Sequence, residues 1–177
     1  MADTRPASGK EADALNVPPQ NLEAEESLLS SILVDNTSLL EVVDLLAPAD
    51  FYRTAHQRVF AAMTELFNRS EPVDLVTLAN HLKQVGGAAA LARLLDAPPS
   101  TNPAHHAKIV HDKAVLRRLI EKSNAIAKRC FMEQGSADDI TDFAEASIFE
   151  VTDKKTRQAF YPLSKLIDGN IDFLEEK

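Results

Sequence analysis

The sequence predicts an all-α protein with a compact helical bundle, which we call the head, followed by a long antiparallel helical hairpin and a C-terminal linker helix. Apolar residues recur every three or four positions through most of the chain, as on the buried face of a helix. No segment shows the strict alternation of a β-strand. Trp is absent and there are only 5 Gly in 177 residues, which argues against a many-turned β-barrel or sandwich.

The pattern divides the chain into four parts. Residues 1–16 are small, polar and without periodicity, so we expect a disordered leader. We expect the head over 17–100, the hairpin over 101–153, and a linker with a docking helix over 154–177.

The head begins with a helix that Asn21 caps, after the rigid Val17-Pro18-Pro19-Gln20 segment. Acidic residues in the first turn suit the positive end of the helix dipole. A second short helix follows the break at residues 35–38 and ends before Pro48. The apolar residues of the first helix are Leu22, Leu28, Leu29, Ile32 and Leu33.

Two more helices of the head have start signals. Thr54 with Gln57 three residues later matches a capping box, and Asp74 matches an N-cap. Gly86-Gly87 ends the helix after Asp74, and a short helix over 88–95 ends before Pro98-Pro99. The apolar faces predicted for these helices comprise Val59, Phe60, Met63, Leu66 and Phe67, then Leu75, Leu78, Ala79 and Leu82.

The hairpin has the longest uninterrupted helical pattern. Asn102-Pro103 places a cap before a first-turn proline, and no breaker follows until Gly135. Ser136 then caps the return helix. We expect Phe131, Ile140 and Phe143 to fill the seam between the two helices and to take part in assembly.

The final segment carries an apolar stripe at helical spacing, formed by Leu163, Leu166, Ile167, Ile171 and Leu174. The earlier helices have partners of their own in this interpretation, so the stripe is predicted to dock on a neighbouring domain or subunit. The alternative is that this helix folds back on its own domain.

The net charge of −8, from 27 acidic and 19 basic residues, argues against a general nucleic-acid-binding protein. Basic residues nevertheless gather on the long helix over 108–129, whereas residues 11–50 have no Lys or Arg and the return helix is acidic. Opposite charges favour antiparallel pairing of the two hairpin helices. A single-stranded nucleic-acid-binding module that uses the 108–129 helix remains an alternative.

No residue pattern predicts catalysis, a cofactor or a metal. Neither Gly9-Lys10 nor Gly86-Gly87 forms the Gly-x4-Gly-Lys-Ser/Thr loop of an ATP site. The cluster of His105, His106 and His111 lacks the ligands and spacing of a zinc site. His56 and His81 lie beside apolar positions and are predicted to be hydrogen-bonded histidines at the core edge. A signal peptide and a membrane-spanning run are lacking, so we expect a cytoplasmic protein.

Two stretches resemble the N-terminal domain of DnaB-type replicative DNA helicases. They are Pro18-Pro-Gln-Asn-Leu-Glu-Ala-Glu-Glu-Ser-Leu-Leu-Ser-Ser-Ile-Leu33, and Asp50-Phe-Tyr-Arg-Thr-Ala-His56 with its continuation to Pro72-Val-Asp-Leu-Val-Thr-Leu78. Val85-Gly-Gly87 and Lys113-Ala-Val-Leu-Arg-Arg-Leu-Ile120 continue the similarity in order. Ser70 and His106 depart from it, since the family often has Gly and Tyr there.

The resemblance implies a non-catalytic collar domain of a hexameric, ATP-dependent 5′-3′ DNA helicase of chromosomal replication. It implies that the domains pair and that the pairs build a ring, that primase and in some systems a helicase loader bind the collar, and that the linker helix docks on the adjacent subunit. ATP and Mg would belong to an ATPase domain outside this chain. A free-standing helical adaptor remains the other alternative.

Overall fold

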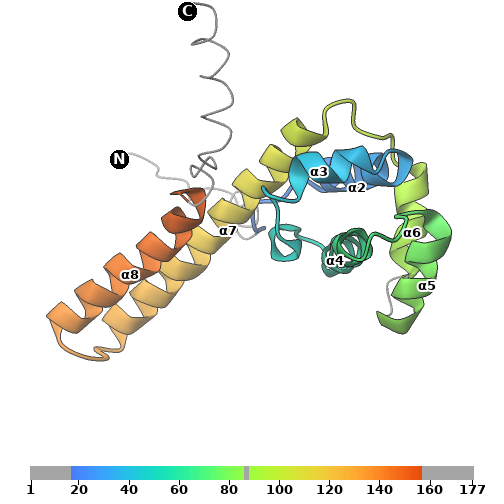
Figure 1. The fold of residues 1–177 in the computed structure, drawn as a ribbon. Coiled ribbons are helices and arrows are strands. Elements are labelled where there is room, and N and C mark those ends of the chain that lie inside the picture. The colour runs from blue at the N-terminus through green and yellow to red at the C-terminus, as the bar shows by residue number, and fades with distance from the viewer. Residues whose placement is uncertain (1–16, 86–87, 157–177) are drawn as a thin grey trace, which may run out of the picture. The chain divides into compact units, whose positions relative to one another are not determined.

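The structure is a computed structural model that describes residues 17–85 and 88–156. Those residues form helices joined by short connections, with no β-strand among them, which confirms the predicted fold class (Figure 1). The chain divides into two compact units, of which the first ends at Arg117 and the second starts at Arg118. The elements are α2 (Leu22–Val34), α3 (Thr37–Val42), the 3-10 helix η1 (Pro48–Asp50), α4 (Thr54–Asn68), α5 (Leu75–Val85), α6 (Ala88–Asp96), α7 (Pro103–Phe131) and α8 (Ala137–Thr156).

Helix α2 packs against α3, α4 and α6 of the first unit. The predicted cap is confirmed, because the side chain of Asn21 accepts a 3.0 Å hydrogen bond from the backbone N–H of Ala24. Leu28, Leu29 and Ile32 are fully buried. The first helix therefore buries the apolar face that its spacing predicts.

Helix α4 starts at Thr54, but the predicted capping box at Thr54 and Gln57 is wrong. The N-cap is Arg53, and no side chain caps it. Thr54 is already inside the helix, and the side chain of Gln57 donates instead to the backbone carbonyl of Phe51, at 2.8 Å. The predicted buried face is confirmed at Val59, Phe60, Met63 and Leu66.

The end of α4 is a Schellman motif with a serine at the left-handed position. Ser70 has a φ of 57°. Its N–H donates to the carbonyl of Phe67, and the N–H of Glu71 donates to the carbonyl of Leu66, both at 2.9 Å. Glycine is the usual residue here because it lacks the Cβ that strains this conformation.

Helices α5 and α6 close the core of the first unit. Oδ1 of Asp74 accepts hydrogen bonds from the N–H groups of Val76 and Thr77, both at 2.8 Å, which confirms the predicted cap. Leu78, Leu82, Leu91 and Leu94 are buried in the same apolar cluster as the faces of α2 and α4.

The start of α7 belongs to the first unit. Asn102 caps it by accepting from the N–H of His105, at 3.0 Å, and Pro103 is its first residue, as predicted. Ala107, Val110 and Ala114 are buried. The first unit therefore extends to Arg117, whereas the sequence suggested a head that ends at residue 100, because the first turns of the long helix complete the core of the head.

The second unit is an antiparallel hairpin of the remainder of α7 with α8. Nζ of Lys122 lies 2.6 Å from Oε2 of Glu150, and the guanidinium carbon of Arg129 lies 3.6 Å from the ring centroid of Phe143. A step of seven residues along α7, from Lys122 to Arg129, therefore matches a step of seven residues back along α8, from Glu150 to Phe143. These two contacts define the register of the antiparallel pair.

The connection between the two hairpin helices has a defined backbone conformation, which positive φ values and a side-chain cap establish. Glu133 and Gly135 have positive φ values of 49° and 109°. A Cβ on Gly135 would meet Cβ and Oδ2 of Asp139 at 3.3 Å. Oγ of Ser136 accepts from the N–H of Asp139 at 3.1 Å, and the Asp139 carboxylate accepts in return from the N–H of Ser136 at 2.9 Å, so the predicted cap is part of a reciprocal pair.

The seam of the hairpin does not include Phe131, which is 90% exposed, so that part of the prediction is wrong. Two residues along a helix rotate the side chain by about 200°. Phe131 therefore lies nearly opposite Arg129, which contacts α8. On α8 as far as Thr152, the side chains that are buried or half-buried are Ile140, Phe143, Ala144, Ser147 and Val151.

Candidate functional site

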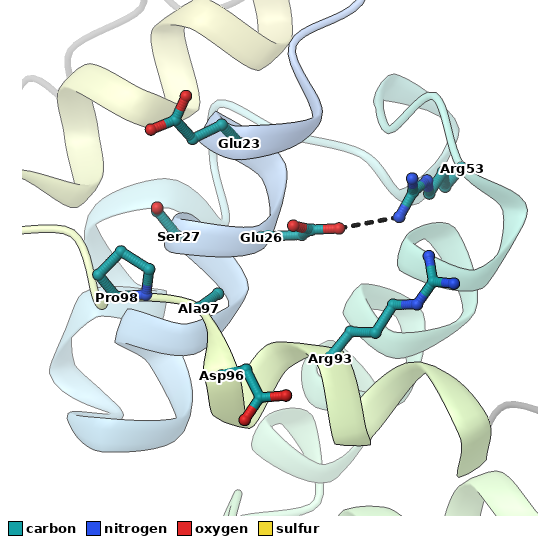
Figure 2. Close-up of a pocket in the computed structure, with 8 residues that line it drawn as sticks. All are labelled: Glu23, Glu26, Ser27, Arg53, Arg93, Asp96, Ala97 and Pro98. Carbon is teal, nitrogen blue, oxygen red and sulfur yellow. Dashed lines mark hydrogen bonds and ion pairs between the residues drawn. The ribbon is translucent and has the colours of Figure 1, made fainter.

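The first unit contains a charged pocket, which we call the head pocket, of about 490 Å³. Figure 2 shows the side chains of Arg53 and Arg93 converging on one side of it, with Glu23 on the other side. Its complete lining is Glu23, Glu26 and Ser27 of α2, Arg53, Arg93 and Asp96 of α6, Ala97 and Pro98. Three segments far apart in the sequence thus build one site.

The charges of the head pocket are only partly neutralised within the protein. Nη1 of Arg53 donates to Oε1 of Glu26 at 2.8 Å, and both side chains are partly buried. Within residues 17–85 and 88–156, no hydrogen bond or ion pair joins the side chains of Glu23, Arg93 or Asp96 to another residue. These three exposed charges are available to a ligand.

A buried acid–histidine pair lies next to the pocket. Oε2 of Glu25 lies 2.7 Å from Nδ1 of His56, and Oε1 accepts from the backbone N–H of Tyr52 at 2.6 Å. Nε2 of His56 lies 3.8 Å from Oε1 of Glu26, the same oxygen that accepts from Arg53. The core of the head is therefore linked by successive polar contacts to the wall of the pocket.

The prediction of a hydrogen-bonded histidine is confirmed at His56, which is fully buried rather than at the core edge. It is confirmed also at His81, whose Nε2 lies 3.0 Å from Oε2 of Glu65. The buried pairing of Glu25 was not predicted, since its position in the first turn suggested only a favourable interaction with the helix dipole. The spacing contained the signal, because Glu25, Leu29 and Ile32 share one helical face.

Arg117 joins two segments of the first unit to α7. Its Nη1 donates to the carbonyl of Pro19 at 2.8 Å, and its Nη2 donates to the carbonyl of Asp50. The guanidinium also lies 5.7 Å from the ring centroid of Tyr52, in a cation–π arrangement. Arg117 therefore has a structural role.

The basic helix is less available for phosphate than its composition suggests. Besides Arg117, Lys122 pairs with Glu150, and Arg129 covers the ring of Phe143. These contacts use cations that a nucleic-acid interface would need. They weigh against the alternative of a nucleic-acid-binding module on the 108–129 helix.

Several large apolar side chains of the second unit are exposed, and we call them the hairpin surface. Their exposed fractions range from 39% to 90%. Of the residues predicted for seam and assembly, Phe131 belongs to this surface, whereas Ile140 and Phe143 are half-buried. The hairpin surface consists of Ile120, Phe131, Met132, Ile148 and Phe149.

The predicted docking residues of the linker lie outside the described residues; they are Leu163, Leu166, Ile167, Ile171 and Leu174. In the part of the chain that the structure describes, no group of three or more His, Cys, Asp and Glu side chains could hold a metal ion. No helix in that part is both long and apolar enough to span a bilayer.

Comparison with known proteins identifies relatives of both sequence and fold. Residues 17–112 match the family described as DnaB-like helicase N terminal domain. The chain is 37% identical to the replicative DNA helicase DnaB of Geobacillus stearothermophilus over 166 residues, which cover 90% of this chain and 37% of that protein. It is 36% identical to the replicative DNA helicase DnaC of Bacillus subtilis over 173 residues, 93% of this chain and 38% of that protein.

Solved structures agree with the sequence comparison. The N-terminal domain of DnaB helicase from Mycobacterium tuberculosis superposes with a TM-score of 0.70 at 37% identity, over 75% of this chain and 99% of that one. The corresponding domain from Helicobacter pylori, described with its interactions with primase, shares the fold with a TM-score of 0.59 at 22% identity. That match covers 62% of this chain and 90% of the other. The chain spans less than two fifths of the two curated relatives.

Proposed function

Since the chain belongs to the family of DnaB-like helicase N-terminal domains, we propose that it is the non-catalytic collar and partner-binding part of a hexameric, ATP-dependent replicative DNA helicase. The observation that carries the proposal is the match of residues 17–112, extended by 37% identity to a replicative helicase over 90% of the chain. The parent protein would act in chromosomal DNA replication in the cytoplasm. ATP and Mg would bind in the part of the relatives that this chain does not span.

The exposed hairpin surface supports self-association. Apolar patches on soluble proteins commonly mark interaction sites. Phe131 and Phe149 are exposed by 90% and 66%, so pairing with a second copy would remove much apolar area from water. In this proposal paired copies form the collar of the ring.

The experiment for self-association is light scattering of this chain over a concentration series. We expect the mass to rise towards a dimer or hexamer, and Phe131→Ser with Phe149→Ser to shift the rise to higher concentration. Glu145→Ser, at an exposed position on the same helix as Phe149, is the matched control and should leave the curve unchanged. A strict monomer at high concentration would contradict pairing through this chain.

We propose primase as the main partner, with a helicase loader as a second one, and DNA contacts through the full-length protein. The test is titration calorimetry of this chain with intact primase from the same organism. Binding with a defined stoichiometry supports the proposal, and no binding at high concentration contradicts it. DNA-stimulated ATP hydrolysis by this chain alone would contradict its non-catalytic role.

The proposal for the linker is docking of its apolar stripe on the adjacent subunit. Its support is the spacing of Leu163, Leu166 and Leu174, which places them on one side of a helix. This role is distinct from partner binding by the head, so the two can be tested by separate substitutions.

A further inference from the structure

Met132 presents a thioether in the connection of the hairpin, directly after the last residue of α7. Its side chain is 56% exposed, whereas Met63 is fully buried in the core of the first unit. A peroxide dissolved in water can reach an exposed thioether, but a close-packed core excludes it. The two methionines of residues 17–85 and 88–156 therefore differ in their access to an oxidant.

The turn after α7 holds Met132 in place. Its N–H donates to the carbonyl of Lys128 at 3.1 Å, and the N–H of Gln134 donates to the carbonyl of Arg129 at 3.2 Å. The side-chain amide of Gln134 also contacts the sulfur, with 3.6 Å between Nε2 and Sδ. A thioether sulfur is a weak acceptor, whereas a sulfoxide is polar and its oxygen is a stronger acceptor. Gln134 therefore has an N–H donor within reach of the oxygen that the oxidised side chain would carry.

Oxidation at this position would change the chemistry of the hairpin surface. Met132 is a member of that surface and follows Phe131, which is more exposed still. Burial of a polar sulfoxide against an apolar partner costs free energy, whereas burial of the thioether is favourable. Pairing and oxidation therefore oppose each other, because a paired surface excludes the peroxide and an oxidised surface pairs less well.

We propose that Met132 is a reversible oxidation site and that its sulfoxide weakens self-association through the hairpin surface. The oxidant is hydrogen peroxide. A sulfur lone pair attacks one peroxide oxygen, and the O–O bond breaks as the S–O bond forms. The second oxygen leaves as hydroxide, which takes the proton from the sulfoxide oxygen and becomes water. Sulfur is oxidised by two electrons, which the peroxide accepts.

The reverse step uses two thiols and a methionine sulfoxide reductase. The sulfoxide oxygen leaves as water, the thioether is restored, and the thiols become a disulfide. The effect on self-association rests on the proposed function, whereas the selective oxidation of Met132 does not.

The first test is peptide mass spectrometry of this chain after graded exposure to hydrogen peroxide. A Cys130→Ser background is used, because Cys130 is also exposed. We expect the peptide with Met132 to gain one oxygen at least about tenfold faster than the peptide with Met63, which is the internal control. Unfolding in urea should remove the difference. Equal rates in the folded chain would overturn the assignment of the site.

The second test repeats light scattering over a concentration series with the oxidised chain in the same background. We expect the rise in mass to need about fivefold more protein, because a polar group now opposes burial. Treatment with the two reductases, one for each sulfoxide epimer, and a thiol should restore the original curve. Circular dichroism should show that the oxidised chain is folded.

Two variants separate Met132 from other effects of peroxide. Met132→Gln places a polar group of similar length on the surface and should shift the curve without any oxidant. Met132→Leu is the matched control, since it keeps an apolar side chain of similar volume and cannot form a sulfoxide. Its curve should match that of the unmodified chain and should not respond to peroxide.

The possible outcomes distinguish this inference from the proposed function. Self-association that persists unchanged after oxidation of Met132 would overturn the coupling and leave the proposed pairing intact. A response of Met132→Leu to peroxide equal to that of the unmodified chain would assign the effect to another residue and would also overturn it. A strict monomer before oxidation would overturn both the pairing and its coupling to Met132.

Discussion

Glu25 and His56 form a polar pair inside the apolar core of the head, with Oε2 and Nδ1 separated by 2.7 Å and both side chains no more than 2% exposed. A buried carboxylate is tolerated only when its oxygens are bonded. Here the backbone N–H of Tyr52 donates a hydrogen bond to Oε1, the other oxygen of the Glu25 carboxylate. The pair therefore connects α2 to α4 at a position that the sequence pattern would assign to a leucine.

We expect His56→Ala to lower the free energy of unfolding by about 3–5 kcal/mol, because it leaves Glu25 buried without one of its partners. Urea denaturation followed by circular dichroism measures it. The matched control is His105→Ala, at an exposed position on α7, which should stay within about 0.5 kcal/mol of the unmodified chain. Equal effects of the two substitutions would show that the buried pair does not stabilise the head.

Asn102 caps α7, whereas Thr54 does not cap α4, so alanine substitutions at the two positions should differ in their effect on stability. Asn102→Ala should cost about 1 kcal/mol of stability, because its side chain accepts from the N–H of His105. Thr54→Ala should cost much less, since Thr54 lies inside the helix and caps nothing. Urea denaturation of both variants checks the order, and a larger loss at Thr54 would restore the capping box that the sequence suggested.

At Ser70, substitution by glycine should stabilise the protein by about 1 kcal/mol. The φ of 57° strains a residue with a Cβ, and glycine removes that strain. Ser123→Gly, in the middle of α7, is the control of opposite sign and should destabilise by about 0.5 kcal/mol. Thermal melts report both, and destabilisation by Ser70→Gly would contradict the strain argument.

Asp74 contributes to stability above its unfolded pKa. The backbone hydrogen bond from Thr77 lowers the pKa of this carboxyl below its usual value of 3.8. The contribution is therefore present above about pH 3.8 and is lost as the pH falls through the lower, folded value. Asp74→Asn keeps an acceptor but cannot titrate, so it should flatten the acid limb of stability in urea melts from pH 7 to pH 3. An unchanged limb would rule out this role.

For the linker, the proposed docking predicts that Leu166→Asp leaves the head folded but impairs ring assembly of the full-length protein, because a charge on the apolar stripe would oppose its burial on the adjacent subunit. Native mass spectrometry of the full-length protein measures the hexamer. Lys165→Asp is the matched control, on the neighbouring position off the stripe. Hexamers that persist in Leu166→Asp would exclude the docking role.

Local patterns predicted the helices well because most of them carry their own start signals. Asn21, Asp74, Asn102 and Ser136 all cap the helices that they precede. The prediction at Thr54 failed because a capping box is recognised only from residue types at a spacing, whereas here the side chain of Gln57 donates to the backbone carbonyl of Phe51 instead. Helical phase explains the error at Phe131, since a residue can be apolar and still face away from the seam.

The head pocket could not be predicted from local patterns. Glu23 and Arg93 are 70 positions apart, and nothing in either neighbourhood marks it as part of a site. Such a pocket arises only when α2, α4 and α6 are packed together. The pair of Glu25 and His56 could have been predicted from the sequence. Each residue falls on the apolar face of its own helix, and a carboxylate and an imidazole can bond to each other.

Arg117 donates hydrogen bonds to main-chain carbonyl oxygens, and this affects how these contacts can change in evolution. Two hydrogen bonds from its guanidinium end on the carbonyl oxygens of Pro19 and Asp50, which any residue would supply at those positions. As far as these two hydrogen bonds are concerned, substitution at either acceptor position need not be matched by a change at Arg117. Lysine at position 117 would lose the fork that reaches two carbonyls together. A search for residues that vary in pairs would not detect these two contacts, because neither of them depends on the side chain of the acceptor residue.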